Sequence, residues 1–133
     1  MIYPLDTNAI SALMREDTQM AAWLSSLLVE VRAVINTITR GEILFGLGRL
    51  PEGRRRAELE AKAQKLFAAL PCEPIPPAAG DLYAKLKIAQ QSRGLPLDEN
   101  DLWIAATALA LNATLVSRDA DFQGIEGLAV VVP

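Results

Sequence analysis

Four acidic residues stand at places in the sequence where they could act on one ligand. Asp6 follows a short apolar run near the N-terminus, and Glu42 lies early in a predicted helix that follows a second apolar run. Asp101 opens an almost wholly apolar helix, and Asp119 comes shortly after a third apolar run. In parallel sheets, strand ends and the first turns of the following helices meet at one edge, where ligands bind. The sequence therefore predicts a crevice lined by four carboxylates.

The chemistry open to these acids is narrowed by what the chain lacks. There is no His and only one Cys, Cys72, which excludes His-assisted nucleophilic hydrolysis and zinc sites built from imidazole or thiolate. Two like charges 4 Å apart repel by roughly 4 kcal/mol at an effective dielectric near 20, so clustered carboxylates require a cation. Hard oxygen ligands favour Mg²⁺ or Mn²⁺, which bind phosphate oxygens in their open positions. We therefore expect metal-assisted chemistry on a phosphate group, with one ion activating water and a second offsetting charge on the leaving oxygen.

Each acid also has an ordinary structural explanation. Asp6 could cap a turn, and Asp119 could cap the turn that follows it. Thr39 and Glu42 have the spacing of a capping box, which taken alone is the better explanation of Glu42. Asp101 could simply benefit from the positive end of its helix, by roughly 0.3 to 1 kcal/mol. All four acids nevertheless fall at the same edge of the predicted sheet, and this shared position favours a common site.

Strands and helices alternate along the chain and would position these acids. Short apolar runs and a proline-bounded segment predict strands at residues 2–5, 33–36, 73–75, 114–116 and 128–132. Apolar residues at helical spacing predict helices at residues 9–15, 20–31, 39–50, 53–70, 77–93 and 102–111. Pro4 removes a hydrogen-bond donor from the first strand, so we expect a locally missing ladder bond there. The alternation predicts an α/β fold with a mostly parallel sheet and helices on both faces.

Length and composition limit the remaining possibilities. A chain of 133 residues predicts one domain over residues 1–133, and its 51% of hydrophobic residues suggests that a partner covers part of the surface. The net charge of −3 gives no broad basic field, so a nucleic acid would have to be held locally, by arginines or metal ions. A lone Cys, no signal peptide and no apolar run long enough to span a bilayer predict a cytoplasmic protein that binds no membrane.

Four motifs, in this order and spacing, resemble those of the PIN-domain ribonucleases. They are residues 5–11 (LDTNAIS), Glu42 early in the helix after the second strand, residues 100–108 (NDLWIAATA) and residues 115–122 (LVSRDADF). Each motif is weak by itself, but the set is specific and covers essentially the whole chain. Within this family the sequence is most similar to the VapC-type toxins of bacterial toxin–antitoxin pairs.

The resemblance implies a PIN-like, Rossmann-like three-layer α/β/α sandwich and an endoribonuclease that depends on Mg²⁺ or Mn²⁺. It also implies an RNA substrate, a homodimer, inhibition by a cognate antitoxin protein, and contact with DNA only indirectly through that antitoxin. Carried over to this sequence, the catalytic and metal-holding residues would be Asp6, Glu42, Asp101 and Asp119. Side chains that orient ligands or water would be Thr7, Asn8 and Ser117, while Asp121 competes with Asp119 for the metal role.

Partner surfaces can be predicted as well. The helices carry more large apolar residues than a small sheet can cover, so a groove is expected near Trp23, Phe45, Leu47, Leu50, Leu59 and Phe67. An amphipathic antitoxin helix would fill it and place a basic side chain against Asp6 and Asp101. Arginines available to RNA are Arg40, Arg49 and Arg118, whereas Asp98 and Glu99 are better explained as cap and surface residues.

Two other functions remain open. A domain that accepts a phosphoryl group on Asp6 would need a lysine at a later strand end, but every lysine lies between Lys62 and Lys87, on predicted helices. That function is therefore disfavoured. A catalytically inert PIN-fold module that only binds a partner is the stronger alternative, although four intact acids argue against it.

Overall fold

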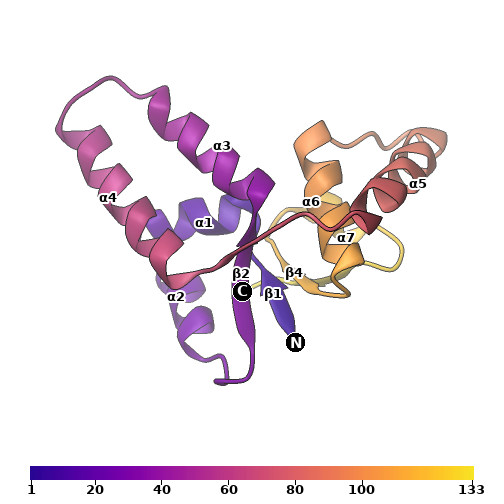
Figure 1. Ribbon diagram of the computed structural model, residues 1–133, viewed down its shortest axis with the longest axis horizontal. Coiled ribbons are helices and arrows are strands. Elements are labelled where there is room, and N and C mark those ends of the chain that lie inside the picture. Colours follow the sequence, from indigo (N-terminus) through magenta and orange to yellow (C-terminus); the bar gives the residue numbers. More distant parts are fainter.

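Five short strands, all paired in parallel, form the centre of the fold (Figure 1). The computed structural model describes residues 1–133, and its strands are β1 (Ile2–Pro4), β2 (Arg32–Asn36), β3 (Cys72–Glu73), β4 (Thr114–Val116) and β5 (Ala129–Val131). β2 pairs with β1 and β3, and β4 pairs with β5. A single parallel bridge between Leu5 and Val116 joins the two groups. The order across the sheet is therefore β3-β2-β1-β4-β5.

Pro4 explains why the two groups of strands meet through so few hydrogen bonds. The main-chain N–H of Leu5 donates to Val34 of β2 at 2.9 Å, and that of Asp6 donates to Val116 of β4 at 3.1 Å. Because donors alternate in direction along a strand, the nitrogen of Pro4 faces β4, where it has no hydrogen to donate. This is the missing ladder bond that the sequence predicts, and it reduces the contact between β1 and β4 to the bridge at Leu5.

The order of the strands predicts a ligand-binding crevice beside β1. From β1 the chain moves outward through β2 to β3, and it then returns to the other side of β1 as β4 and β5. The direction of winding therefore reverses between β1 and β4. In open α/β sheets, ligands bind outside the carboxyl ends of the strands at such a reversal. Asp6 follows β1 and Ser117 follows β4, so both residues lie at this point.

Helices cover the sheet in two groups. They are α1 (Thr7–Met14), α2 (Thr18–Ser25), α3 (Thr37–Gly48), α4 (Arg54–Ala69), α5 (Ala78–Ser92), α6 (Glu99–Ala110) and α7 (Ala120–Gln123). Figure 1 shows α1 to α4 on one side of the strands and α5 to α7 on the other. Consecutive residues of β4 pack against the two groups of helices. Val116 belongs to the core under α1 to α4, and Leu115 belongs to the core under α5 to α7. This arrangement confirms the three-layer sandwich.

Most predicted elements are present, and the differences have physical causes. The helix predicted at residues 20–31 is α2, and it ends at Ser25, because Arg32 already pairs with β1 and the chain needs a turn to reach it. The edge strand predicted at residues 73–75 is β3, which stops at Glu73 because Pro74 cannot donate to a ladder. The turn predicted after Asp119 is the one-turn helix α7. None of the helices combines the length and the apolar character that crossing a bilayer requires.

Candidate active site

Asp6 lies at the carboxyl end of β1 and is held there by neutral donors. The residue is 2% exposed. Its Oδ1 accepts the main-chain N–H of Ala9 at 2.8 Å, which caps α1, and its Oδ2 accepts the hydroxyl of Ser117 at 2.6 Å. Burial raises the pKa of the Asp6 carboxyl; the two hydrogen bonds oppose this rise, and the charges of Asp119 and Glu42 add to it. The capping role expected for Asp6 is real, but it coexists with repulsion from two other acids.

Ser117 connects the ends of β1 and β4. It is fully buried, and its Oγ donates to Asp6 while accepting the main-chain N–H of Asp119 at 3.0 Å. Asp119 in turn caps α7, because its Oδ1 accepts the main-chain N–H of Asp121 at 2.9 Å. The cap predicted for Asp119 is therefore confirmed. Its second carboxylate oxygen has no donor from the protein, so a capping role leaves Asp119 free to bind a further ligand.

Glu42 is not part of a capping box. α3 begins one residue after Asn36, and Asn36 is its cap, with Oδ1 accepting the main-chain N–H of Thr39 at 2.8 Å. Thr39 therefore lies inside the first turn, and the capping-box explanation of Glu42 is wrong. Oε1 of Glu42 instead accepts the hydroxyl of Thr7, from the first turn of α1. This contact holds the Glu42 carboxylate at the strand ends, where α1 begins.

Asp101 faces the other acids from the first turn of α6. It is half-buried; burial raises the pKa of its carboxyl to about 6, and the charges that add to this rise are those of Asp98, Asp119, Glu42 and Asp6. Asp98 has the largest effect of the four, and its side chain makes no capping hydrogen bond. A spacing of three residues puts Asp98 and Asp101 on one face of the helix, which is the signal that could have identified Asp98 as a fifth acid near the crevice.

None of the four predicted acids is paired with a basic side chain. The acids that form ion pairs are Glu16, Asp17, Glu58, Glu60, Glu73 and Glu99. The acids of the crevice accept hydrogen bonds only from hydroxyls and main-chain amides. Burial raises the pKa values of Asp6 and Asp101, and the charges of the neighbouring acids add to this rise. The crevice therefore keeps a net negative charge that a cation from solution can balance.

The donor chemistry of the crevice suits a hard cation, although its carboxylates do not converge on one point. No three side chains of the metal-binding types His, Cys, Asp or Glu lie close enough together to hold one ion. Both carboxylate oxygens of Asp6, and one oxygen each of Glu42 and Asp119, already accept a hydrogen bond from the protein. Carboxylate oxygens without a competing basic side chain are nonetheless the ligands that Mg²⁺ or Mn²⁺ requires.

Comparison with known proteins identifies the family. The model of the PIN domain matches residues 3–128. The chain belongs to the PIN-domain family. Asp6, Glu42, Asp101 and Asp119 all fall within the matched residues, and the resemblance that the sequence motifs carry is confirmed.

This PIN domain is similar, over almost its full length, to proteins named as ribonucleases. It is 36% identical to Ribonuclease VapC1 of Haemophilus influenzae (strain R2866), over 96% of this chain and 95% of that protein. It is 31% identical to the VapC ribonuclease Y4jK of Sinorhizobium fredii, over 97% of this chain and 95% of that protein. The structure of VapBC-1 from nontypeable Haemophilus influenzae matches with a TM-score of 0.88 at 30% identity, covering 99% of this chain and 98% of that chain. The PIN-like fold is thereby confirmed.

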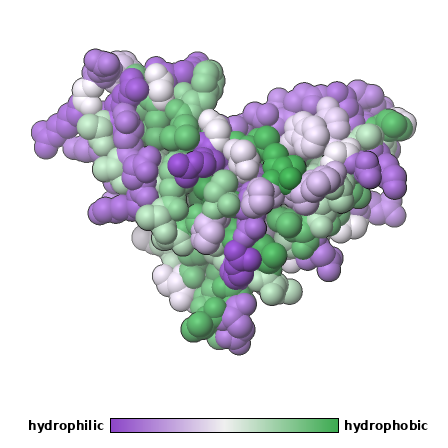
Figure 2. Space-filling view, viewed as in Figure 1, coloured by the Kyte–Doolittle hydropathy of each residue, from purple (hydrophilic) through white to green (hydrophobic).

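Two depressions of the PIN domain meet one of the four acids, because Glu42 lines both. The first, of about 270 Å³, lies between α1, α3 and α4 and extends from Thr7 and Glu42 to Arg15 and Arg55. Its apolar walls are Met14, Ile43, Leu47, Leu50 and Leu59. The second, of about 280 Å³, lies between α3 and Asn100 at the start of α6. Figure 2 shows the surface hollowed between the half that carries α3 and α4 and the half that carries α5 and α6.

The other predicted polar residues lie around the crevice or outside it. Asn8 is exposed in the first turn of α1. Asp121 is exposed on α7, where its main-chain N–H rather than its carboxylate joins the hydrogen-bond network. Glu99 binds Lys87 and the hydroxyl of Tyr83, which confirms it as a surface residue.

Two of the three arginines predicted to contact RNA are engaged within the PIN domain. Arg118 donates two hydrogen bonds to the carboxylate of Asp17, at 2.8 and 2.9 Å. The guanidinium of Arg40 lies over the ring of Phe67, 4.4 Å from its centre. Arg49, at the end of α3, is exposed and forms no ion pair. Its guanidinium lies 5.5 Å from the centre of the exposed Phe45 ring, so Arg49 and this ring present themselves to solvent together.

Proposed function

We propose that this protein is a metal-dependent endoribonuclease that acts as the toxin of a toxin–antitoxin pair. The proposal is carried by four mutually repelling carboxylates from four separate elements, gathered beside the reversal of the sheet without a basic partner. A purely structural cluster would be expected to include some of the 13 Lys and Arg of the chain, because pairing would remove the repulsion. The ribonuclease names of the relatives support the same activity.

The residues of the crevice would act at different positions. Bound Mg²⁺ or Mn²⁺ would activate water for attack on an RNA phosphodiester and offset charge on the leaving oxygen. The residues that would hold the metal are Asp6, Glu42, Asp101 and Asp119. Ser117 and Thr7 orient two of these carboxylates by donating hydrogen bonds to them. Asn8 and Asp121, both exposed, would orient substrate or water at the rim.

Cleavage of RNA by the purified protein, with and without a divalent ion, tests the proposal. We expect cleavage with Mg²⁺ or Mn²⁺ and none with EDTA. Mn²⁺ should also raise the melting temperature, because an ion that binds only the folded chain stabilises it. An inert PIN-fold binding module would give neither response. Mapping RNA ends after brief induction in cells would then identify the substrate.

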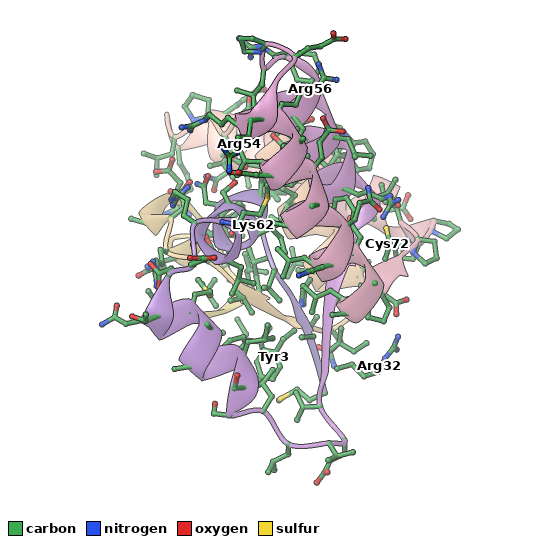
Figure 3. The ribbon with its side chains drawn as sticks, turned by 90° about the vertical axis from the view of Figure 1, so that its left-hand side faces the viewer. Tyr3, Arg32, Arg54, Arg56, Lys62 and Cys72 are labelled. Atoms are coloured by element: carbon green, nitrogen blue, oxygen red, sulfur yellow. The ribbon has the colours of Figure 1, made fainter.

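The groove of about 270 Å³ between α1, α3 and α4 suits the proposed antitoxin segment. Glu42 lies at one end of this groove, and Arg15 and Arg55, neither of which forms an ion pair within the chain, line it further along. Figure 3 shows the molecule from the side of α4, with Arg54 and Arg56 near the upper end of that helix. Unlike Arg15 and Arg55, these two arginines form ion pairs, with Glu58 and Glu60 respectively. We propose that an amphipathic helix fills the groove and turns a basic side chain toward the acids.

Expression with and without the neighbouring gene tests the partner. Expressed alone, the protein should stop growth; co-expressed, it should form a soluble complex whose RNase activity recovers as Mg²⁺ or Mn²⁺ is raised, because the basic side chain competes with the metal. Harmless and monomeric behaviour when expressed alone, in a cell that contains its RNA targets, would contradict the toxin proposal.

We further propose a cytoplasmic homodimer that reaches DNA only through its antitoxin. Large apolar side chains are exposed at several positions, among them Leu28, Val29 and Ile88. A second copy or the antitoxin would cover such surface. Light scattering of the purified protein should give the mass of a dimer, and a monomer over the accessible concentration range would contradict this part of the proposal.

A further inference from the structure

One exposed face of α3 carries an aromatic residue beside the acids. Phe45 is 67% exposed, and the guanidinium of Arg49 lies 5.5 Å from the centre of its ring. Glu42 precedes Phe45 by three residues, so their side chains leave the helix as neighbours, with Cβ atoms roughly 5–6 Å apart. An exposed ring therefore stands next to one of the four carboxylates of the crevice.

The depression of about 280 Å³ connects Phe45 to the acids. Its lining consists of Thr37, Ile38, Gly41, Glu42, Phe45 and Asn100. Glu42 is the acid of this lining on the side of α3, and Asn100, which immediately precedes Asp101 in the sequence, lines it on the side of α6. A Cβ added at Gly41 would meet no heavy atom within 4 Å. The space above this part of α3 is therefore open to a flat group that approaches the helix backbone.

We propose that Phe45 is a base-stacking residue, and that the nucleobase next to the cleaved phosphodiester lies in this depression against its ring. The proposal rests on the proposed ribonuclease function, which puts the phosphodiester at the acids. Unpaired RNA bases are commonly bound by stacking on aromatic rings or guanidinium planes and by hydrogen bonds to their edges. Phe45 and Arg49 supply the stacking surfaces, and Thr37 and Asn100 supply the hydrogen-bonding groups.

The charges of the protein favour binding of RNA by stacking. The net charge is −3, and two of the three arginines predicted to contact RNA, Arg118 and Arg40, are engaged within the chain. Stacking supplies affinity through the face of a base and needs no basic surface. A protein helix fits this depression less well than the neighbouring groove, because its apolar lining is limited to Ile38 and Phe45.

Kinetics on an RNA oligonucleotide that spans the mapped cleavage site test the stacking. Phe45→Ala should lower kcat/KM by about tenfold or more, chiefly through KM, because stacking stabilises ground and transition states alike. Phe45→Trp should preserve the value, since it keeps an aromatic face. Leu95→Ala is the matched control, because Leu95 is 53% exposed between α5 and α6, outside the depression.

An abasic substrate adds a readout that a structural role would not change. Removing the base next to the cleaved bond should lower kcat/KM of the wild type by about the same factor as Phe45→Ala does. In Phe45→Ala itself, the abasic substrate should cause no further fall in kcat/KM. Independent, multiplying losses would overturn the stacking, because the base and the ring would not be in contact.

Filling the depression gives a test in which the fold is not weakened. Gly41 and Gly48 both lie in α3 with open space around them, and glutamine favours a helix more than glycine does. Gly41→Gln should reduce RNA cleavage as Phe45→Ala does, whereas Gly48→Gln should leave it unchanged. Equal cleavage by the two variants would overturn the proposal.

The outcomes separate this inference from the function on which it rests. No cleavage by the wild type with Mg²⁺ or Mn²⁺ would overturn the ribonuclease function itself. Cleavage that is equal in the wild type and in Phe45→Ala would overturn only the stacking. Normal cleavage by Phe45→Ala together with escape from antitoxin inhibition would also overturn it, and would assign the depression to the protein partner.

Discussion

The acids of the crevice and the acids of the outer surface have opposite surroundings. On the surface, Asp17 receives two hydrogen bonds from Arg118, which lower the pKa of its carboxyl. In the crevice, Asp6 is almost fully buried but has only neutral donors, and the pKa of its carboxyl is raised. The fold thus places basic side chains where charge is already well solvated and keeps them from the place where charge is least tolerated.

This contrast supports the proposed metal site in the crevice. The pKa of Asp101 is raised to about 6 by burial and by neighbouring acids, so ionised Asp101 destabilises the folded chain. Pairing with Lys or Arg would remove that cost. The same pairing would also occupy the lone pairs that a metal ion needs, and the crevice keeps its charge unpaired.

The largest expected effect comes from removing an acid of the crevice. Asp6→Asn, Asp101→Asn or Asp119→Asn should each reduce Mg²⁺-dependent RNA cleavage more than about 100-fold, since even the residues that orient metal ligands contribute 10- to 100-fold. The fold should be retained or stabilised, because one repelling charge is gone. The matched surface variant Asp17→Asn should cleave as the wild type does. Wild-type cleavage by Asp101→Asn would contradict the assignment of the site.

Glu42→Gln should separate activity from stability. Asn36 rather than Glu42 caps α3, and the Thr7 hydroxyl can donate to an amide oxygen as it does to a carboxylate. We therefore expect an unchanged melting temperature together with loss of metal-dependent cleavage. A drop in melting temperature with cleavage intact would show that Glu42 supports the fold and does not bind the metal.

The pH dependence of stability should reflect Asp101. Its carboxyl keeps its proton to about pH 6 in the folded chain, whereas the ordinary pKa is 3.8, so the free energy of unfolding should fall as pH rises between these values. Reduced for the solvent screening of a half-buried group, the difference corresponds to about 1–2 kcal/mol. Urea titrations from pH 4 to pH 7 measure it. Asp101→Asn should flatten this part of the profile, and an unaltered profile would contradict the raised pKa.

The smallest effect is expected on the surface. The ion pair with Arg118 lowers the pKa of Asp17, so it stabilises the folded chain above the ordinary pKa of Asp17 and this stabilisation is lost on acidification. Arg118→Gln removes the pair and should remove this stabilisation. We expect a slight fall in melting temperature near pH 7 and unchanged RNA cleavage. A strong loss of cleavage would instead indicate that Arg118 contacts the RNA.

Features that depend on strand ends could be predicted from the sequence. The buried strand at residues 114–116 was predicted with the bounds that the structure has, because a short apolar run followed by polar residues has few alternatives. Asp6 and Ser117 follow directly from such ends. The missing hydrogen bond at Pro4 could also be predicted, since the lack of an N–H group is a property of proline itself and does not depend on neighbouring residues.

Side-chain partners that lie far apart in the sequence could not be predicted. Thr7 and Glu42 are 35 positions apart, and local spacing instead suggested Thr39 as the partner of Glu42. The capping box failed because Asn36, at the end of β2, starts α3 earlier than expected. The sequence predicts a cap at Asp98, but its side chain makes no capping hydrogen bond, and its charge instead adds to the raised pKa of Asp101.

The hydrogen bond between Asp6 and Ser117 has a consequence for protein synthesis. The two residues are 111 positions apart, so the first acid of the crevice leaves the ribosome long before its partner is made. Domains fold as units during translation once the required chain has emerged. The crevice therefore cannot assemble on an unfinished chain, and a product that stops before β4 lacks Ser117 and Asp119 altogether. The contact between Asp6 and Ser117 therefore forms only after β4 has been synthesised.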